Sequence, residues 1–218
     1  MKATLIAATL AAGLLASALA SAEAYSPDLI ELDGARSLLF EGGPAVSLAG
    51  GGTLECWLAP DWTADPGYDP VLLSNLGPEG YAWAIALLRD RDGLAIVAGE
   101  EEDVVAFDFT DGQLHHVAVS QLEDGLVVII DGRVAGTSAL MLGEAADSVL
   151  VVGSLDGGAN PFTGAIAGLR IWHEVVPREA LARFAFEDVV AGEHPMLEAL
   201  SVVSDFTAEQ LRYVDTVE

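Results

Sequence analysis

The stretch from residue 114 to residue 132 constrains the fold of this chain more than any other part of the sequence. Two apolar runs, Leu114–Ser120 and Leu126–Ile130, are rich in β-branched residues and flank a short polar segment that ends in Asp-Gly. This pair supplies the positive φ angle of a tight turn, and a second pair, Asp131-Gly132, turns the chain again towards Arg133–Leu140. The pattern predicts a meander of three antiparallel strands. Because the runs are too continuous for a sheet with one face in water, we expect the meander at the centre of a β-sandwich.

Short apolar segments between Gly-, Pro- and Asp-rich turns predict further strands on both sides of this meander. In Tyr81–Leu88 bulky residues alternate with alanine, which is typical of a strand with one packed face. Pro177 followed by Arg178–Phe184 favours a short helix after the last strand. Before the first strand we expect a polar lead-in over Tyr25–Gly34. The remaining expected strands are Arg36–Glu41, Ala45–Leu48, Thr53–Ala59, Val71–Asn75, Leu94–Ala98, Val104–Phe109, Val149–Val152 and Phe162–His173.

The two ends of the chain differ in composition from the part between them. Residues 1–24, a lysine followed by the apolar stretch 3–22, are typical of a secretory signal peptide cleaved before Tyr25. A stretch of this length is also long enough to stay uncleaved and anchor the chain in a bilayer. Both alternatives place the domain 25–186 outside the cytoplasm, in the periplasm or secreted. Residues 187–218 form an acidic tail, in which a capping-box pattern at Thr207 predicts a short helix through Leu211 and Val214.

The charge of the chain restricts its partners. It carries 34 acidic against 9 basic residues, a net charge of −25. Nucleic acids require clustered Lys and Arg, so we exclude them, and anionic lipid surfaces are disfavoured for the same reason. The charge favours solubility, cationic partners or divalent metals. The single cysteine, Cys56, excludes an internal disulfide framework, and its parity with Leu54 and Leu58 predicts a small buried side chain.

Three segments resemble the motifs of a known family, in the family's order. His115–Ala118 with Ile130-Asp131-Gly132, the strand Thr53–Leu58 and the closing segment Phe162–Trp172 are similar to the core of laminin-G-like domains in the concanavalin A-like lectin and glucanase superfamily. The resemblance implies an all-β fold, a two-sheet antiparallel jelly-roll sandwich. To it we add a hydrophobic N-terminal helix and the short helical tail.

The sequence offers no catalytic set of this superfamily. Its glucan hydrolases resemble one another in an E-x-D-x-x-E strand, where two carboxylates about 5 Å apart act on the glycosidic bond. The run Glu100–Asp103 has no second glutamate at the needed offset. His115 and His116 are strand neighbours and point to opposite faces, so they cannot bind one metal together. We therefore expect a protein that is not an enzyme.

Two loops carry candidate binding residues. In the loop 60–70, Trp62 and Tyr68 are ligand-binding candidates, because exposed aromatic rings stack on sugars; capping of the sandwich edge is the alternative. Asp156 and Asn160 in a glycine-rich loop, with Asp33 in the entry segment, offer the oxygen ligands that calcium prefers. A bare turn is the alternative for this loop. Against calcium, Ala167 and Gly168 stand where the closing strand of the family often carries an acid.

Two functions remain open. The first is a non-catalytic extracytoplasmic interaction or assembly subunit in a larger membrane-associated complex. It would contact other protein subunits, with residues 3–22, the tail or both as attachment points. The second is a secreted lectin-like module that binds glycans, with calcium as a candidate ligand. The plain sandwich and the added tail favour the first, on an argument that rests on analogy of fold.

Overall fold

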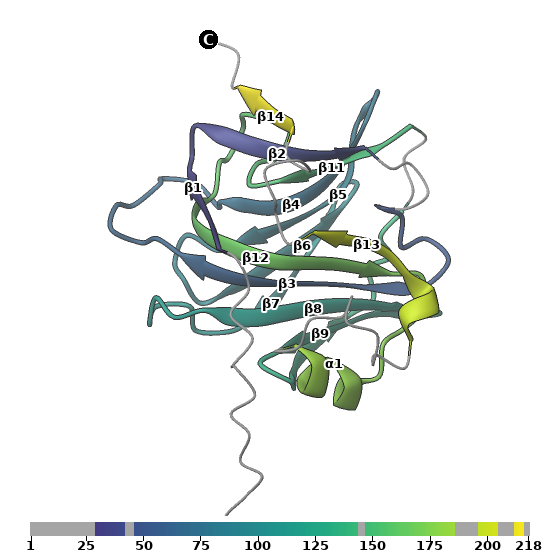
Figure 1. Cartoon of the computed structure of the whole chain (residues 1–218). Helices are drawn as coiled ribbons and strands as arrows, with labels where there is room; N and C mark the ends of the chain where they lie inside the picture. The colour runs from purple at the N-terminus through teal and green to yellow at the C-terminus, as the bar shows by residue number, and fades with distance from the viewer. Residues whose placement is uncertain (1–28, 42–45, 144–146, 186–195, 205–211, 216–218) are drawn as a thin grey trace, which may run out of the picture.

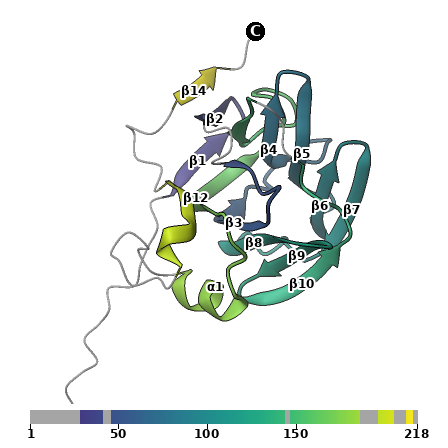
Figure 2. The same cartoon turned by 90° about the vertical axis from the view of Figure 1, so that its right-hand side faces the viewer.

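The fold is a sandwich of two antiparallel sheets that lie face to face (Figures 1 and 2). The computed structural model describes residues 29–41, 46–143, 147–185, 196–204 and 212–215. The first sheet has the order β1-β12-β3-β8-β9-β10, with β13 on β12, and the second the order β14-β2-β11-β4-β5-β6-β7. The strands of the first sheet are β1 (Ile30–Asp33), β3 (Gly52–Pro60), β8 (His115–Leu122), β9 (Gly125–Ile130), β10 (Arg133–Ser138), β12 (Thr163–Trp172) and β13 (Leu200–Ser204). Those of the second are β2 (Arg36–Glu41), β4 (Val71–Gly77), β5 (Gly80–Leu87), β6 (Gly93–Ala98), β7 (Glu101–Ala106), β11 (Val149–Val152) and β14 (Arg212–Asp215).

The meander predicted from the two Asp-Gly pairs is confirmed as β8, β9 and β10. Asp131 and Gly132 have φ angles of 51° and 71°, and they join Ile130 to Arg133 in a two-residue turn. Positive φ at both positions matches the right-handed twist of the flanking strands. At the other turn, a Cβ on Gly125 would collide with the carbonyl oxygen of Ser138. The glycine is therefore required there by the close approach of β10.

The main core lies between the sheets. Leu54, Cys56 and Leu58 of β3 point into it, together with large side chains of the second sheet such as Trp83. Cys56 is fully buried, as its parity predicts, and burial raises the pKa of its thiol to about 12. The thiol is thus a packing group and stays protonated at neutral pH.

The outer face of the first sheet is buried as well. The helix α1 (Arg178–Phe184) begins after Pro177, as predicted, and lies against this face (Figure 1). Leu181 of α1 and Val176 pack with Ala118, Ile129 and Trp172 in a second apolar cluster. The inner strands β3, β8 and β12 consequently have two covered faces, which accounts for their continuous apolar runs.

The structure corrects the predictions for the ends of the sandwich. The expected lead-in contains β1, which pairs with β12 so that Asp33 lies opposite Thr163. Residues 46–48 are not a strand, although one was expected there, and β7 begins three residues before the predicted Val104. In the tail, Leu197–Ala199 form a 3-10 turn, while Val214, expected in a helix, lies in β14. Tertiary pairing with β2 and β12 outweighs local helix preference in this segment.

The predicted leader, residues 1–24, lies outside the described residues, and so does the proposed cap at Thr207. Within the parts of the chain that the structure does describe, no helix has the length and apolar character needed to cross a bilayer. The signal-peptide and anchor alternatives therefore both stay predictions.

Removal of a tryptophan on the covered outer face should be costly. Trp172→Ala is expected to lower the free energy of unfolding by about 3–5 kcal/mol, and so is Trp57→Ala, because both are large-to-small changes in packed sites. Trp172 is fully buried and Trp57 is 5% exposed. Urea unfolding followed by far-UV circular dichroism measures the loss. Tyr81→Ala, at an exposed aromatic residue, is the control. Tryptophan variants that unfold at the same urea concentration as the wild-type protein would contradict the packing described here.

Candidate functional site

Five connections meet at one end of the sandwich, which we call the loop end: residues 34–35, 61–70, 88–92, 107–114 and 153–162. Hydrogen bonds join four of them, all but 34–35, to one another or to the neighbouring strands. Asp61 N donates to Thr163 O at 2.9 Å, Val71 N to Asn160 O at 2.8 Å, and Phe109 N to Arg91 O at 2.9 Å. The Asp69 carboxylate accepts from Arg89 N at 2.8 Å. The loop end is therefore a bonded platform on the rigid sandwich, the place where binding residues are commonly found.

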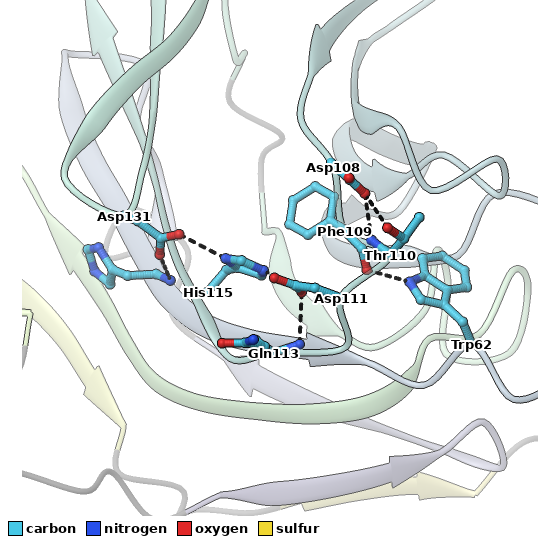
Figure 3. A network of polar contacts seen from close by, with 9 residues as sticks. Trp62, Asp108, Phe109, Thr110, Asp111, Gln113, His115 and Asp131 are labelled. Atoms are coloured by element: carbon cyan, nitrogen blue, oxygen red, sulfur yellow. Dashed lines mark hydrogen bonds and ion pairs between the residues drawn. The ribbon is translucent and has the colours of Figure 1, made fainter.

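Trp62 belongs to the loop 61–70 and is held by two neighbouring loops. Its Nε1 donates to the carbonyl oxygen of Phe109 at 3.1 Å (Figure 3). Its own carbonyl accepts from the Arg91 guanidinium at 3.2 Å, and the Arg91 Cζ lies 5.3 Å from the centre of the indole ring. The ring is half-buried against the main core. Trp62 thus combines the predicted edge-capping role with a part that stays accessible.

Two hollows share Trp62. The smaller, of about 130 Å³, brings Trp62 and Tyr68 together, and Tyr68 donates its hydroxyl to Pro161 O at 3.2 Å. The larger, about 520 Å³, is an open groove, which we call the Trp62 groove. Only the groove has the size of an ordinary ligand site. Besides Trp62 it is lined by Glu31, Ala59, Pro60, Asp61, Thr63, Arg91, Thr110, Gly112, Gly164 and Ala165.

His115 fixes the loop that forms one wall of the Trp62 groove. Its Nδ1 lies 2.8 Å from Asp131 Oδ2 and its Nε2 lies 3.0 Å from Asp111 Oδ1 (Figure 3). The rings of Phe107 and Phe109 pack edge-on against it. Burial alone would lower the pKa of His115, but hydrogen bonds and charges of Asp131 and Asp111 outweigh it and raise the pKa above 6.5. His115 is thus a clamp between the 107–114 loop and the β9–β10 turn.

Side-chain caps stabilise the same loop from within. The Asp108 carboxylate accepts from the hydroxyl and the backbone N–H of Thr110, and these bonds lower the pKa of Asp108. The Asp111 carboxylate accepts from Gln113 N at 2.9 Å and meets His115, and both contacts lower its pKa. The resulting fixed turns hold Thr110 at the groove.

The three residues predicted for calcium lie at the loop end or directly beside it. Each already makes a hydrogen bond within a turn or between two loops. Asp33 Oδ1 accepts from Ala35 N at 2.9 Å, and Asp156 Oδ1 accepts from Ala159 N at 2.8 Å. The Asn160 amide donates to Asp69 O at 3.1 Å. Within the described ranges, no three His, Cys, Asp or Glu side chains gather where they could hold a metal ion. A calcium site that adds amide and backbone oxygens stays a prediction.

Of the two aromatic residues named from the sequence, Trp62 lines the groove and Tyr68 lines only the smaller hollow. Sequence reasoning did not name Arg91, Glu31 and Thr110, which line the groove as well. Arg91 has a φ of 70°, which is uncommon for a residue other than glycine and places it at the top of a tight turn. The Asp-Arg-Asp-Gly sequence signals that turn. Its approach to Trp62 depends on a contact across 29 positions of sequence and has no local signal.

A dedicated calcium site should be distinguishable from general screening of the acidic surface. At a free concentration 100 times the dissociation constant, calcium would add about 2.7 kcal/mol of stability, and the gain would grow further only with the logarithm of the concentration. Asp156→Ala should reduce the calcium-dependent rise in melting temperature and leave the magnesium effect unchanged. Asp124→Ala, at an exposed acid in another turn, is the control. Equal shifts with calcium and magnesium in the wild-type protein would rule the site out.

The clamp predicts a pH dependence of stability. Because the pKa of His115 is raised in the folded protein, its contribution is complete below about pH 6.5 and is lost as the pH rises through the folded value. The difference in unfolding free energy between wild type and His115→Gln should therefore shrink as the pH rises above 6.5. His173→Gln, at an exposed histidine, should show no such trend in urea unfolding. A constant difference for His115→Gln would contradict the assigned role of the charge.

Comparisons with known proteins agree with this architecture. Domain 4 of AbnA, an extracellular GH43 arabinanase from Geobacillus stearothermophilus solved with arabinotriose, superposes with a TM-score of 0.55 at 16% identity over 71% of this chain and 75% of that one. The CBM40 of the Ruminococcus gnavus IT-sialidase bound to α2,3-sialyllactose gives 0.55 at 15% identity over 72% and 95%. The SAP-like pentraxin of Limulus polyphemus gives 0.54 at 12% identity over 85% and 97%. A search of curated protein sequences finds no match.

A laminin-G-type family model matches residues 34–182, more than half of the chain. The matched range contains the meander, the closing strand β12 and the beginning of α1. The resemblance inferred from the sequence motifs is thereby confirmed. This protein belongs to the laminin-G-like family of the Concanavalin A-like lectin/glucanases superfamily.

Proposed function

We propose that this protein is a non-catalytic glycan-binding module and that the Trp62 groove is its binding site. The observation that carries the proposal is the composition of one ligand-sized hollow. In about 520 Å³ it combines an indole ring with a guanidinium group, carboxylates and hydroxyls. Sugars present C–H faces that pack on aromatic rings and hydroxyls that pair with such polar groups.

The polar groups of the groove are held ready for hydrogen bonding. Hydrogen bonds from the backbone and the side chain of Thr63 lower the pKa of Asp61, which therefore stays ionised as an acceptor. Arg91 is fixed by its bond to Trp62 O and keeps further N–H donors. A guanidinium donor and carboxylate acceptors that line the same groove as the ring suit a neutral hydroxylated ligand.

The same groups support a binding role over a hydrolytic one. A glycosidase needs one carboxyl group whose pKa is raised, so that it can protonate the leaving oxygen. The pKa of Asp61 is shifted in the opposite direction. The absence of catalysis is therefore part of the proposal, in line with the missing glutamate motif in the sequence.

The comparisons add support, although at these identities they show only the fold. Two of the similar structures were solved with arabinotriose and with α2,3-sialyllactose, and a third similar structure is described as a putative carbohydrate binding protein from Bacteroides ovatus. Such neighbours favour the glycan hypothesis over the subunit hypothesis. A location outside the cytoplasm, inferred from residues 1–24, fits a glycan ligand and is part of the proposal.

The pairing of the tail gives less support to the assembly-subunit hypothesis. The tail was its second attachment point, and the described part of the tail is built into the sandwich. β13 pairs with β12 and β14 pairs with β2, so each extends a sheet. The first attachment point, residues 3–22, lies outside the described residues.

Binding to a glycan array that includes arabinotriose and α2,3-sialyllactose tests the proposal. Hits are then measured by calorimetry with the wild-type protein and with Trp62→Ala. We expect Trp62→Ala to weaken binding at least tenfold, about 1.4 kcal/mol, because it removes the stacking surface. Trp62→Tyr, which keeps a ring, should retain part of the affinity.

Tyr81→Ala is the matched control for this experiment. Tyr81 is an exposed aromatic residue at the start of β5, away from the loop end, and its loss should leave glycan binding unchanged. Thermal melting confirms that each variant is folded. Absence of any glycan hit, or a hit whose affinity is the same with Trp62→Ala, would refute the proposed site.

A further inference from the structure

A third hollow lies on the opposite side of the first sheet from the main core, beside helix α1. Its volume is about 280 Å³, and we call it the helix pocket. None of its lining residues belongs to the Trp62 groove. They are Trp57, Gln113, Leu114, His115, His116, Asp131, Gly132, Ala182 and Ala185.

The one deeply buried polar ring in this lining is His116, which is 2% exposed. Its Nε2 lies 2.8 Å from Glu55 Oε2, behind the pocket wall. Glu55 Oε1 accepts from Trp172 Nε1 at 2.9 Å and lies 3.5 Å from the Arg170 guanidinium. Burial opposes ionisation of Glu55, but these partners outweigh it and lower the pKa of its carboxyl. An ionised carboxylate only accepts, so Nε2 of His116 carries the proton.

The other ring nitrogen of His116 is left without a hydrogen bond. Nδ1 is buried and has no partner in the structure. In a neutral imidazole protonated at Nε2, Nδ1 is an acceptor with a free lone pair. Buried polar groups of native proteins nearly always have a partner, from the protein or from ordered water. His116 lines the helix pocket, but Nδ1 itself is covered, so a hydroxyl in the pocket reaches it after a small shift of the pocket wall.

The other walls define the chemistry of a suitable ligand. Trp57 packs against His116 with ring centres 5.1 Å apart, and its Nε1 is already bonded to Ala185 O at 3.0 Å. Ala182, Ala185 and Leu114 add apolar surface. Asp131 Oδ2 faces the ring of His115, and Asp131 Oδ1 accepts a hydrogen bond from the backbone N–H of His116. The carboxylates of Asp131 and Glu55 already have partners, so no charge in the pocket remains for a ligand ion to balance.

We propose that the His116 ring is neutral and that the helix pocket binds a small neutral hydroxylated molecule, whose hydroxyl donates to His116 Nδ1 while its apolar body packs against Trp57. An anion would meet the lone pair and two carboxylates in a chain of net charge −25. The proposal concerns a site separate from the Trp62 groove and does not depend on the glycan function.

The test uses the full chain labelled with ¹⁵N-histidine. The ring nitrogen resonances of His116 are followed while cyclohexanol is added, with its methyl ether as the matched probe that lacks the donor. We expect cyclohexanol to shift the His116 Nδ1 resonance in a saturable manner, and we expect the ether to bind at least tenfold more weakly. Failure of cyclohexanol, glucose and myo-inositol to shift this resonance would overturn the proposal, and Nδ1 would then be satisfied by water. Equal binding of alcohol and ether would also overturn it, since the pocket would be merely apolar.

Variants locate the site without touching the buried network. Ala182→Leu fills the pocket from an exposed position of α1 and should weaken cyclohexanol binding at least tenfold. Ala139→Leu makes the same change at an exposed position that lines neither hollow and should leave binding unchanged. Trp62→Ala should also leave it unchanged, which separates this site from the groove. Full binding to a folded Ala182→Leu protein would refute the location.

Discussion

The covered face of the first sheet depends on the hydrogen bonds and the ion pair of one buried carboxylate, that of Glu55. It joins β3 to β8 through His116 and to β12 through Trp172 and Arg170. An ionised group 2% exposed is costly unless its hydrogen bonds are satisfied, and these partners provide that. Removal of one partner would leave the carboxylate uncompensated in a dry site. The register of three central strands is thus fixed by one polar centre as well as by apolar packing.

A polar centre of this kind requires a cover, and the cover is helix α1. Val176 and Leu181 seal one side of it, and Trp57 seals another through its bond to Ala185 O. The edge strands β7 and β10 show a different pattern. Exposed and buried positions mix in them, as expected where one face meets water. The short helix thus accounts for the covered outer face of the central strands of the first sheet.

Much of the fold was predictable because its signals are local. The Asp-Gly pairs, the β-branched runs and Pro177 each indicate a structure within a few residues, and the predicted β2, β11 and α1 have the observed boundaries. The short strands β1 and β14 were missed because their pairing partners, β12 and β2, are distant in sequence. For the site, Trp62 and Tyr68 were recognisable as loop aromatics. Arg91 and Glu31 reach the Trp62 groove only through the tertiary fold, for which no local pattern exists.

The two candidate sites are connected through one dipeptide. His115 and His116 point to opposite faces of β8, as their adjacency predicts. His115 clamps the loop beside the Trp62 groove, whereas His116 faces the helix pocket and Glu55. Asp131 contacts both, with Oδ2 on the His115 ring and Oδ1 on the His116 backbone N–H. The turn formed by Asp131 and Gly132 therefore has a role besides joining β9 to β10. It places the Asp131 carboxylate where it contacts both the groove loop, through His115, and the wall of the helix pocket, through His116.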